Sequence, residues 1–196
     1  MSQTRWIATI GERLETVGAS LPGRYRHLVS ATLVGTFVLM LLGAYTSAIG
    51  AGLACPDWPK CYDTWVPFMH PDVVAGASYS RRQIAAEWLH RTFAAVVGPA
   101  ILATAIGAWT THPEDDLVRG ASTAAVLLLP LQVYMGGLTV RAALEPIVVT
   151  AHLGLALTIL VLLTIVTVLV WLPRDDAPLE TTGRRTPERE ERASAE

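Results

Sequence analysis

Charged residues are scarce in this chain of 196 amino acids. They make up 16% of it, against roughly 25% in an average soluble domain, while hydrophobic residues make up 52%. The few charges are also segregated, because they lie at the two ends and between long apolar runs. This scarcity argues against an ordinary soluble domain and favours a lipid bilayer as the surroundings. The net charge of −2 gives no electrostatic basis for a nucleic-acid partner.

Cysteine is almost absent, and a cleavable leader is not evident. Cys55 and Cys61 are the two cysteines, and both lie in one segment between apolar runs. The chain has no closely spaced Cys-x-x-Cys pair and no second pair, which disfavours a thiol oxidoreductase that works with a quinone. Residues 1–26 lack a short apolar core followed by a small-residue cleavage site, so we expect no cleaved signal peptide.

Four apolar runs are each long enough to cross a hydrocarbon layer of about 30 Å. We place them near residues 27–49, 84–110, 120–140 and 147–172. Short connections make neighbouring helices antiparallel, and the long exception is the loop 50–83. The prediction is therefore an all-α integral membrane protein, an antiparallel four-helix bundle over residues 27–173.

The two ends of the chain are expected to lie in the cytoplasm. Residues 1–26 show helical apolar spacing typical of a helix on the membrane surface, broken at Pro22 and Gly23. The tail 174–196 is charged and is predicted to be disordered. Of the Lys and Arg residues, ten lie in segments that are inside if the N-terminus is inside, four lie in the opposite loops, and Arg91 lies within a span. This asymmetry predicts a plasma-membrane protein with cytoplasmic termini and an extracytoplasmic cysteine loop.

Ionisable residues inside the predicted spans are few, and each one is costly in a membrane. Glu87, His90 and Arg91 stand at i, i+3 and i+4, so they share one face of the second span. His152 stands in the fourth span, which runs in the same direction. Each histidine lies five or six residues from the start of its predicted helix, which is roughly 8–9 Å of depth at ~1.5 Å per residue.

Two imidazoles at one depth on parallel helices can bind a metal from opposite sides. Haem iron accepts axial histidines on both faces of the macrocycle, so we predict that His90 and His152 bind a haem. The alternative for each histidine alone is a hydrogen bond between helices, and zinc would need further ligands. Arg91 has two interpretations that stay open: it pairs with Glu87, or it binds a haem propionate.

Small residues accompany these side chains. Gly98 and Gly154 follow the two histidines in their spans, and Gly98 is expected to let something bulky approach the backbone. In the third span, Gly136 and Gly137 are interpreted as sites of close helix packing. Gly43 in the first span is interpreted in the same way.

Four sequence blocks together resemble one family, the haem A synthases. The blocks are GAGLACPDWPKC (50–61), EWLHR (87–91), QVYMGGLTV (132–140) and EPIVVTAHLG (145–154). They occur in the order of the family and cover most of the chain between residues 42 and 155. Typical members have two such bundles, and this chain resembles the N-terminal one.

The resemblance implies an activity and a role for each matching residue. Members oxidise a methyl group of haem O to the formyl group of haem A through successive hydroxylations with oxygen from water. His90 and His152 match the axial ligands, and Glu87 matches an essential carboxylate near the reacting methyl. Cys55 and Cys61 match a pair that forms a disulfide in part of the family, here as a structural staple or in a redox role.

The single bundle makes a homodimer the expected substitute for the missing half. Expected partners are a haem O synthase, a terminal oxidase and an electron acceptor of unknown type, for which a quinone is a candidate. The competing hypothesis is a small membrane cytochrome b that carries electrons on haem b and performs no chemistry on it. Glu87 discriminates between the two, because a bis-histidine carrier needs no buried carboxylate one turn from its ligand.

Overall fold

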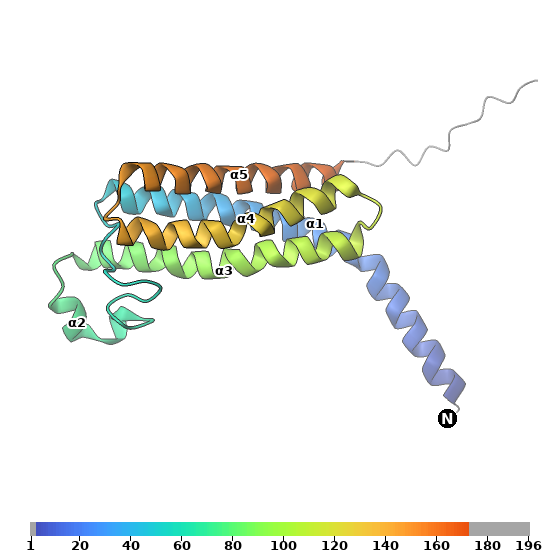
Figure 1. The fold of residues 1–196 in the computed structure, drawn as a ribbon. Helices are drawn as coiled ribbons and strands as arrows, with labels where there is room; N and C mark the ends of the chain where they lie inside the picture. The colour runs from blue at the N-terminus through green and yellow to red at the C-terminus, as the bar shows by residue number, and fades with distance from the viewer. Residues whose placement is uncertain (1–2, 173–196) are drawn as a thin grey trace, which may run out of the picture.

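Long helices account for most of the computed structural model, which describes residues 3–172 and, from residue 23 onward, their side chains. The predicted tail 174–196 lies outside the described residues. Figure 1 shows four long helices side by side. The elements in chain order are α1 (Gln3–Ala48), η1 (Pro67–Met69), α2 (Pro71–Ala75), α3 (Arg81–Thr111), α4 (Asp116–Arg141) and α5 (Pro146–Trp171).

All four long helices are apolar enough and long enough to cross a membrane. Their large apolar side chains face outward: Val96 is 62% exposed, Leu127 72% and Ile147 71%. In water such a surface would be unfavourable, whereas in a bilayer it contacts lipid. The predicted fold, an all-α integral membrane bundle, is confirmed.

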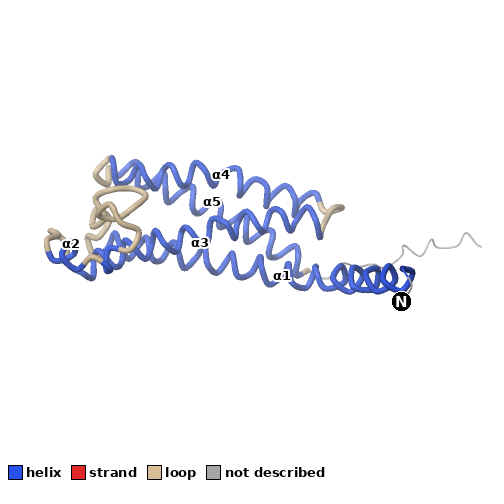
Figure 2. Tube along the Cα trace, turned by 90° about the horizontal axis from the view of Figure 1, so that it is seen from below, coloured by secondary structure: helices blue, strands red, loops and turns tan. Residues whose placement is uncertain are grey.

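The first helix corrects one prediction. We expected Pro22 and Gly23 to separate a surface helix from the first span, but α1 continues through both without interruption. A proline removes only its own N–H from the hydrogen-bond ladder, so a long helix can pass through it at a local cost. Figures 1 and 2 show the N-terminal part of α1 extending beyond the bundle.

The helices pack as a ring in the order α1, α3, α4, α5. The main contacts are α1 with α3 and α4 with α5, and α1 with α5 and α3 with α4 complete the ring. Consequently α3 and α5, which run in the same direction, lie diagonally across the bundle.

The buried apolar core between the helices lies toward the middle of the bundle and the end that carries the connection between α3 and α4. One cluster contains Val97 and Ile101 of α3, Ala125 of α4, and Ile159 and Leu163 of α5. A second cluster continues toward the N-terminal end of the span in α1. In α3 and α5 the buried residues of these two clusters therefore lie C-terminal to the two histidines.

The loop between α1 and α3 forms a small structure of its own over the end of the bundle where α3 begins, with α2 at its edge (Figure 2). Its buried residues pack against Ile84 and Ala86 of α3. Ser80 caps α3 through a reciprocal pair of hydrogen bonds with Gln83, a capping box. This cap starts α3 three residues earlier than predicted, at Arg81.

Candidate functional site

His90 is seated against α1 at a glycine. A Cβ built on Gly43 would stand 3.0 Å from Cε1 of His90, so a side chain at this position would require the ring to move by a few tenths of an ångström. The ring also approaches the backbone of Leu39, one turn away on α1. Its Nδ1 atom is buried and has no hydrogen-bond partner among the described residues.

His152 is seated against α4 in the same manner. A Cβ on Gly136 would stand 3.4 Å from its Cε1, and the ring approaches the backbone of Gln132, one turn away on α4. Nδ1 of His152 is likewise buried and without a partner in the described part of the chain. A buried polar atom without a partner is uncommon in a native protein and calls for an explanation such as a missing ligand.

The two seats repeat each other in detail. Thr46 Oγ1 donates a hydrogen bond of 2.7 Å to the carbonyl of Gly43, and Thr139 Oγ1 donates one of 2.7 Å to the carbonyl of Gly136. Both glycines lie five residues before the end of their helix, α1 at Ala48 and α4 at Arg141. The pair α1–α3 and the pair α4–α5 thus present one histidine each in equivalent surroundings.

The two histidines come from different helix pairs of the bundle. They lie on the diagonal helices α3 and α5, close enough for their charges to interact. The predicted equal distance from the helix starts is wrong, because α3 begins at Arg81 and α5 at Pro146. Depth is matched in another way: Val97 and Ile159 are the first residues that α3 and α5 contribute to the buried cluster they share with α4, and each follows its histidine by seven residues.

Glu87 is buried one turn before His90. It is 6% exposed, and its Oε1 accepts a hydrogen bond of 2.9 Å from Nε of Arg91. The ion pair was one of the two interpretations of Arg91, and it is present. The other N–H groups of Arg91 point at the cysteine loop, where they bond to the carbonyls of Cys55, Asp57 and Lys60. A guanidinium has five N–H donors, and Glu87 and the three carbonyls use four of them. The structure therefore gives no support to the interpretation that Arg91 binds a haem propionate.

Cys55 and Cys61 form a disulfide, and both are buried in the core of the loop. The loop is docked onto the second helix pair by Trp58, whose indole lies against Gly137 of α4. Burial, Tyr79 and Asp57 together raise the pKa of the Tyr62 phenol above its usual value, so this loop residue stays neutral at physiological pH.

The residues present fit a haem better than a tetrahedral metal. Within residues 23–172, no three His, Cys, Asp or Glu side chains converge on one point, whereas zinc takes three or four such ligands. Two opposed histidines suffice for haem iron. The two glycine seats and the position of the histidines on diagonal helices are the structural observations that favour a haem between α3 and α5.

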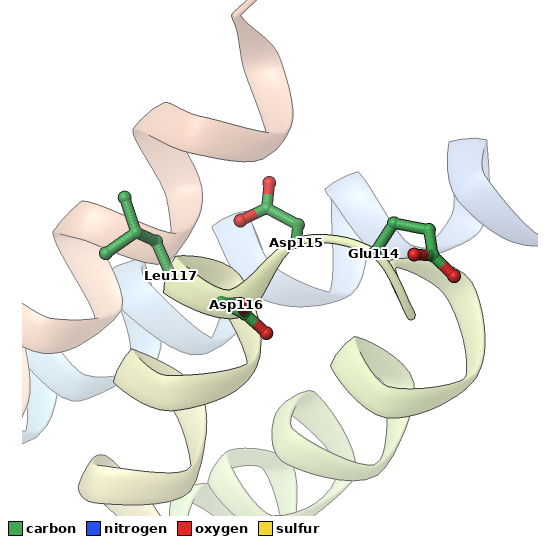
Figure 3. A pocket seen from close by; sticks show the side chains of 4 residues that line it. All are labelled: Glu114, Asp115, Asp116 and Leu117. Atoms are coloured by element: carbon green, nitrogen blue, oxygen red, sulfur yellow. The ribbon is translucent and has the colours of Figure 1, made fainter.

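A hollow at the other end of the bundle is unrelated to this site. It lies in the connection between α3 and α4 and is lined by Glu114, Asp115, Asp116 and Leu117 (Figure 3). Asp116 pairs with Arg119, and Asp115 caps α4 by accepting the N–H of Val118. Asp115 and Asp116 are therefore accounted for by the start of α4.

Sequence reasoning missed the role of two glycines. Gly43 and Gly136 were interpreted as helix-packing positions, but each lies against an imidazole. Gly98 was expected to admit something bulky, and its nearest neighbour is the Leu129 side chain at 3.9 Å. The repeated spacing Gly-x-x-Thr in the first and third spans was a visible signal, although its meaning depends on which helices are neighbours.

These features define a multi-pass, all-helical membrane protein with a pair of histidines inside its bundle. Comparison with known proteins makes this more specific. The family model described as a cytochrome oxidase assembly protein (COX15-CtaA) matches residues 26–193. The chain therefore belongs to this family, which is the family of the haem A synthases.

Curated relatives carry two different names. The chain is 37% identical over 145 residues to a Heme A synthase of Shewanella oneidensis, covering 69% of this chain and 43% of that protein. It is 34% identical over 144 residues to a Protoheme IX farnesyltransferase of Halobacterium salinarum, covering 74% of this chain and 28% of that protein. It is 32% identical over 177 residues to a Protoheme IX farnesyltransferase 1 of Natronomonas pharaonis, covering 88% of this chain and 34% of that protein. The chain spans less than half the length of each, and no solved structure matches it.

Proposed function

We propose that this chain acts in haem A formation, by holding haem O between α3 and α5 and oxidising a ring methyl group to a formyl group. The observation that carries the proposal is the pair His90 and His152, on diagonal helices, each seated against a glycine of the neighbouring helix. Glu87 lies one turn from His90, where a carrier of electrons would not need it. Relatives named Heme A synthase support the same conclusion.

The chemistry sets the demands on the site. A methyl group and one water become a formyl group, four protons and four electrons. Two successive hydroxylations with water, followed by loss of one water, satisfy this balance. The electrons leave in pairs to an external acceptor, for which we propose a quinone, and the protons leave through the protein to water.

The named residues meet these demands as follows. His90 and His152 bind the iron of the substrate and fix the plane of its ring. Glu87 accepts a proton from the attacking water or stabilises positive charge at the reacting carbon. The apolar core from Val97 inward excludes water from the rest of the bundle.

The relatives named Protoheme IX farnesyltransferase bear on the partner. Only 26–34% of the length of these relatives corresponds to this chain, so their name describes a protein with a large additional part. Joining a part that makes haem O to a part that consumes it would pass the product directly between them. We therefore propose a haem O synthase as a partner of this chain, with a terminal oxidase as the recipient of haem A.

The test is conversion by the purified protein. The wild type is given haem O and a quinone, and the extracted haem is identified by chromatography and mass. We expect hydroxylated haem O and haem A from the wild type. Glu87→Gln should retain the absorption spectrum of bound haem and lose conversion. Unchanged conversion in Glu87→Gln would overturn the role of Glu87, and a wild type that holds only haem b and converts nothing would favour the cytochrome b alternative.

We further propose that two copies of the chain associate in the plasma membrane. The support is that the part of this chain that aligns with the Shewanella oneidensis Heme A synthase corresponds to 43% of that protein, so two copies would supply two such parts. Native mass spectrometry of the protein in lipid nanodiscs tests this. A dimer with two haems is the expected result, and an active monomer with one haem would refute it.

A further inference from the structure

Arg91 joins the cysteine loop to Glu87. Its Nε donates to Oε1 of Glu87 at 2.9 Å. Its Nη1 donates to the carbonyls of Asp57 and Lys60, and its Nη2 donates to the carbonyl of Cys55 at 3.0 Å. The Arg91 side chain is 11% exposed and that of Glu87 is 7% exposed, so both side chains of the ion pair are largely buried.

The loop is closed in a way that brings these three carbonyls together. The disulfide joins Cys55 to Cys61. Asp57 lies between them, and its carboxylate accepts the backbone N–H of Tyr62 at 2.7 Å and of Asp63 at 2.8 Å. Cys61 and Thr64 exchange two backbone hydrogen bonds. Because several closures act on one short segment, its carbonyls can form a rigid cup for a planar cation.

We propose that Arg91 is a positioning residue that transmits the shape of the disulfide loop to the Glu87 carboxylate. The inference rests on the proposed function, in which Glu87 acts on the substrate. A guanidinium is a rigid planar fork. Once the three carbonyls fix Nη1 and Nη2, the direction of the Nε–H bond is fixed, and Oε1 of Glu87 is held with it. A lysine has a single side-chain nitrogen, so it cannot donate to the three loop carbonyls and at the same time orient the Glu87 carboxylate.

The proposal makes the geometry of Glu87 depend on the redox state of the loop. A dithiol reductant transfers two electrons and two protons to the Cys55–Cys61 bond, which yields two thiols and the cyclic disulfide of the reductant. The cup then loses its covalent closure and Arg91 loses its fixed orientation. His90 and His152 are seated on α1 and α4 through Gly43 and Gly136, so iron binding should persist.

Trp88 supplies a matched control on the same helix. Its Nε1 donates to the carbonyl of Trp65 at 2.7 Å, and its ring packs edge-on against Phe68. It therefore holds the same loop to α3, but its hydrogen bond goes to the loop and not to Glu87. Trp88→Phe removes this tether and keeps the aromatic packing.

The experiment combines these variants in the full-length protein. Arg91→Lys and Trp88→Phe are each made with the disulfide intact and with Cys55→Ser/Cys61→Ser. Three quantities are measured: haem binding by absorbance, the infrared carboxylate band of Glu87, assigned by its loss in Glu87→Gln, and conversion of haem O.

Arg91→Lys should bind haem within about twofold of the wild type and convert it about 10- to 100-fold more slowly, a typical penalty for a misplaced catalytic group. The Glu87 band should shift. Loss of the disulfide should shift the same infrared band and slow the conversion of haem O in the otherwise wild-type protein. In Arg91→Lys, loss of the disulfide should slow conversion by less than about a further twofold, because the effects of interacting sites are not additive. For Trp88→Phe, the effect of the substitution on the conversion rate and the effect of disulfide loss should multiply.

Two results would overturn the inference: a Glu87 band that is unchanged in Arg91→Lys, or effects of Arg91→Lys and disulfide loss that multiply. Should Arg91→Lys not fold, reducing the wild type with dithiothreitol decides the matter, since the Glu87 band must shift and must return on reoxidation. A wild type that binds haem but converts no haem O would refute the proposed function, while the infrared comparison would still decide the role of Arg91.

Discussion

Gly43 of α1 lies directly against the imidazole of His90 of α3, and a Cβ at this glycine would stand 3.0 Å from Cε1 of the ring. A side chain at position 43 would therefore require a shift of the imidazole ring or of the helix. The position of a histidine that we propose as an iron ligand is thus set by the absence of a side chain on the neighbouring helix.

Replacing Gly43 with alanine should displace His90 and weaken haem binding. Overpacking of this kind costs about 1–3 kcal/mol, which is on the order of tenfold or more in affinity at 1.4 kcal/mol per tenfold. Haem titration followed by absorbance measures the effect. Gly120→Ala is the matched control, because nothing lies within 4 Å of its Cβ position. Equal affinity of Gly43→Ala and Gly120→Ala would show that the seat does not position the ligand.

The adjacent glycines of α4 should respond differently to the same substitution. Gly136→Ala crowds Cε1 of His152, and Gly137→Ala crowds the indole of Trp58, at 3.2 Å from Cδ2. The first should alter the haem spectrum. The second should change Trp58 fluorescence and make the loop more sensitive to protease, with the haem spectrum retained. A haem spectrum altered to the same extent in both variants would contradict this division.

Removal of the disulfide should lower stability by a modest amount. Cys55 and Cys61 are separated by six positions, and closing so short a loop is worth about 2 kcal/mol in the chain-entropy model. We expect Cys55→Ser/Cys61→Ser to unfold roughly 5 °C below the wild type, given the usual shift per kcal/mol for a chain of this size. Dithiothreitol should lower the melting temperature of the wild type equally and leave the double variant unchanged. A collapse of the whole fold would mean that the bridge holds more than the loop.

The orientation in the membrane can be tested at a single side chain. Lys60 is the one lysine of the sequence, and it is exposed on the cysteine loop. If the loop is extracytoplasmic, as the distribution of arginines predicts, a membrane-impermeant amine reagent should label Lys60 in intact cells. Peptide mass spectrometry identifies the label, and Lys60→Arg is the control. Labelling that requires broken cells would reverse the predicted topology.

Several parts of the site were predictable from the chain. The pair His90 and His152 stood out because ionisable side chains are rare in apolar spans, and Glu87 stood out by its helical spacing from His90. The ion pair of Glu87 with Arg91 followed from the same spacing but could not be separated from the alternative. The seats of the rings could not be found in this way, because Gly43 and Gly136 matter only through the helices packed beside them.

The sequence by itself determined that four apolar runs cross a bilayer, because the cost of unpaired backbone groups in hydrocarbon leaves a helix as the only structure for a lone apolar segment. It also determined which ionisable groups share a helix face, because that depends on spacing alone. Only the tertiary structure decided that α3 and α5 lie diagonally, that each histidine rests on a glycine of a neighbouring helix, and that the fork of Arg91 is filled by carbonyls of the disulfide loop. Such contacts join residues separated by 16 to 47 positions in the chain, and local periodicity carries no information about which distant surfaces meet.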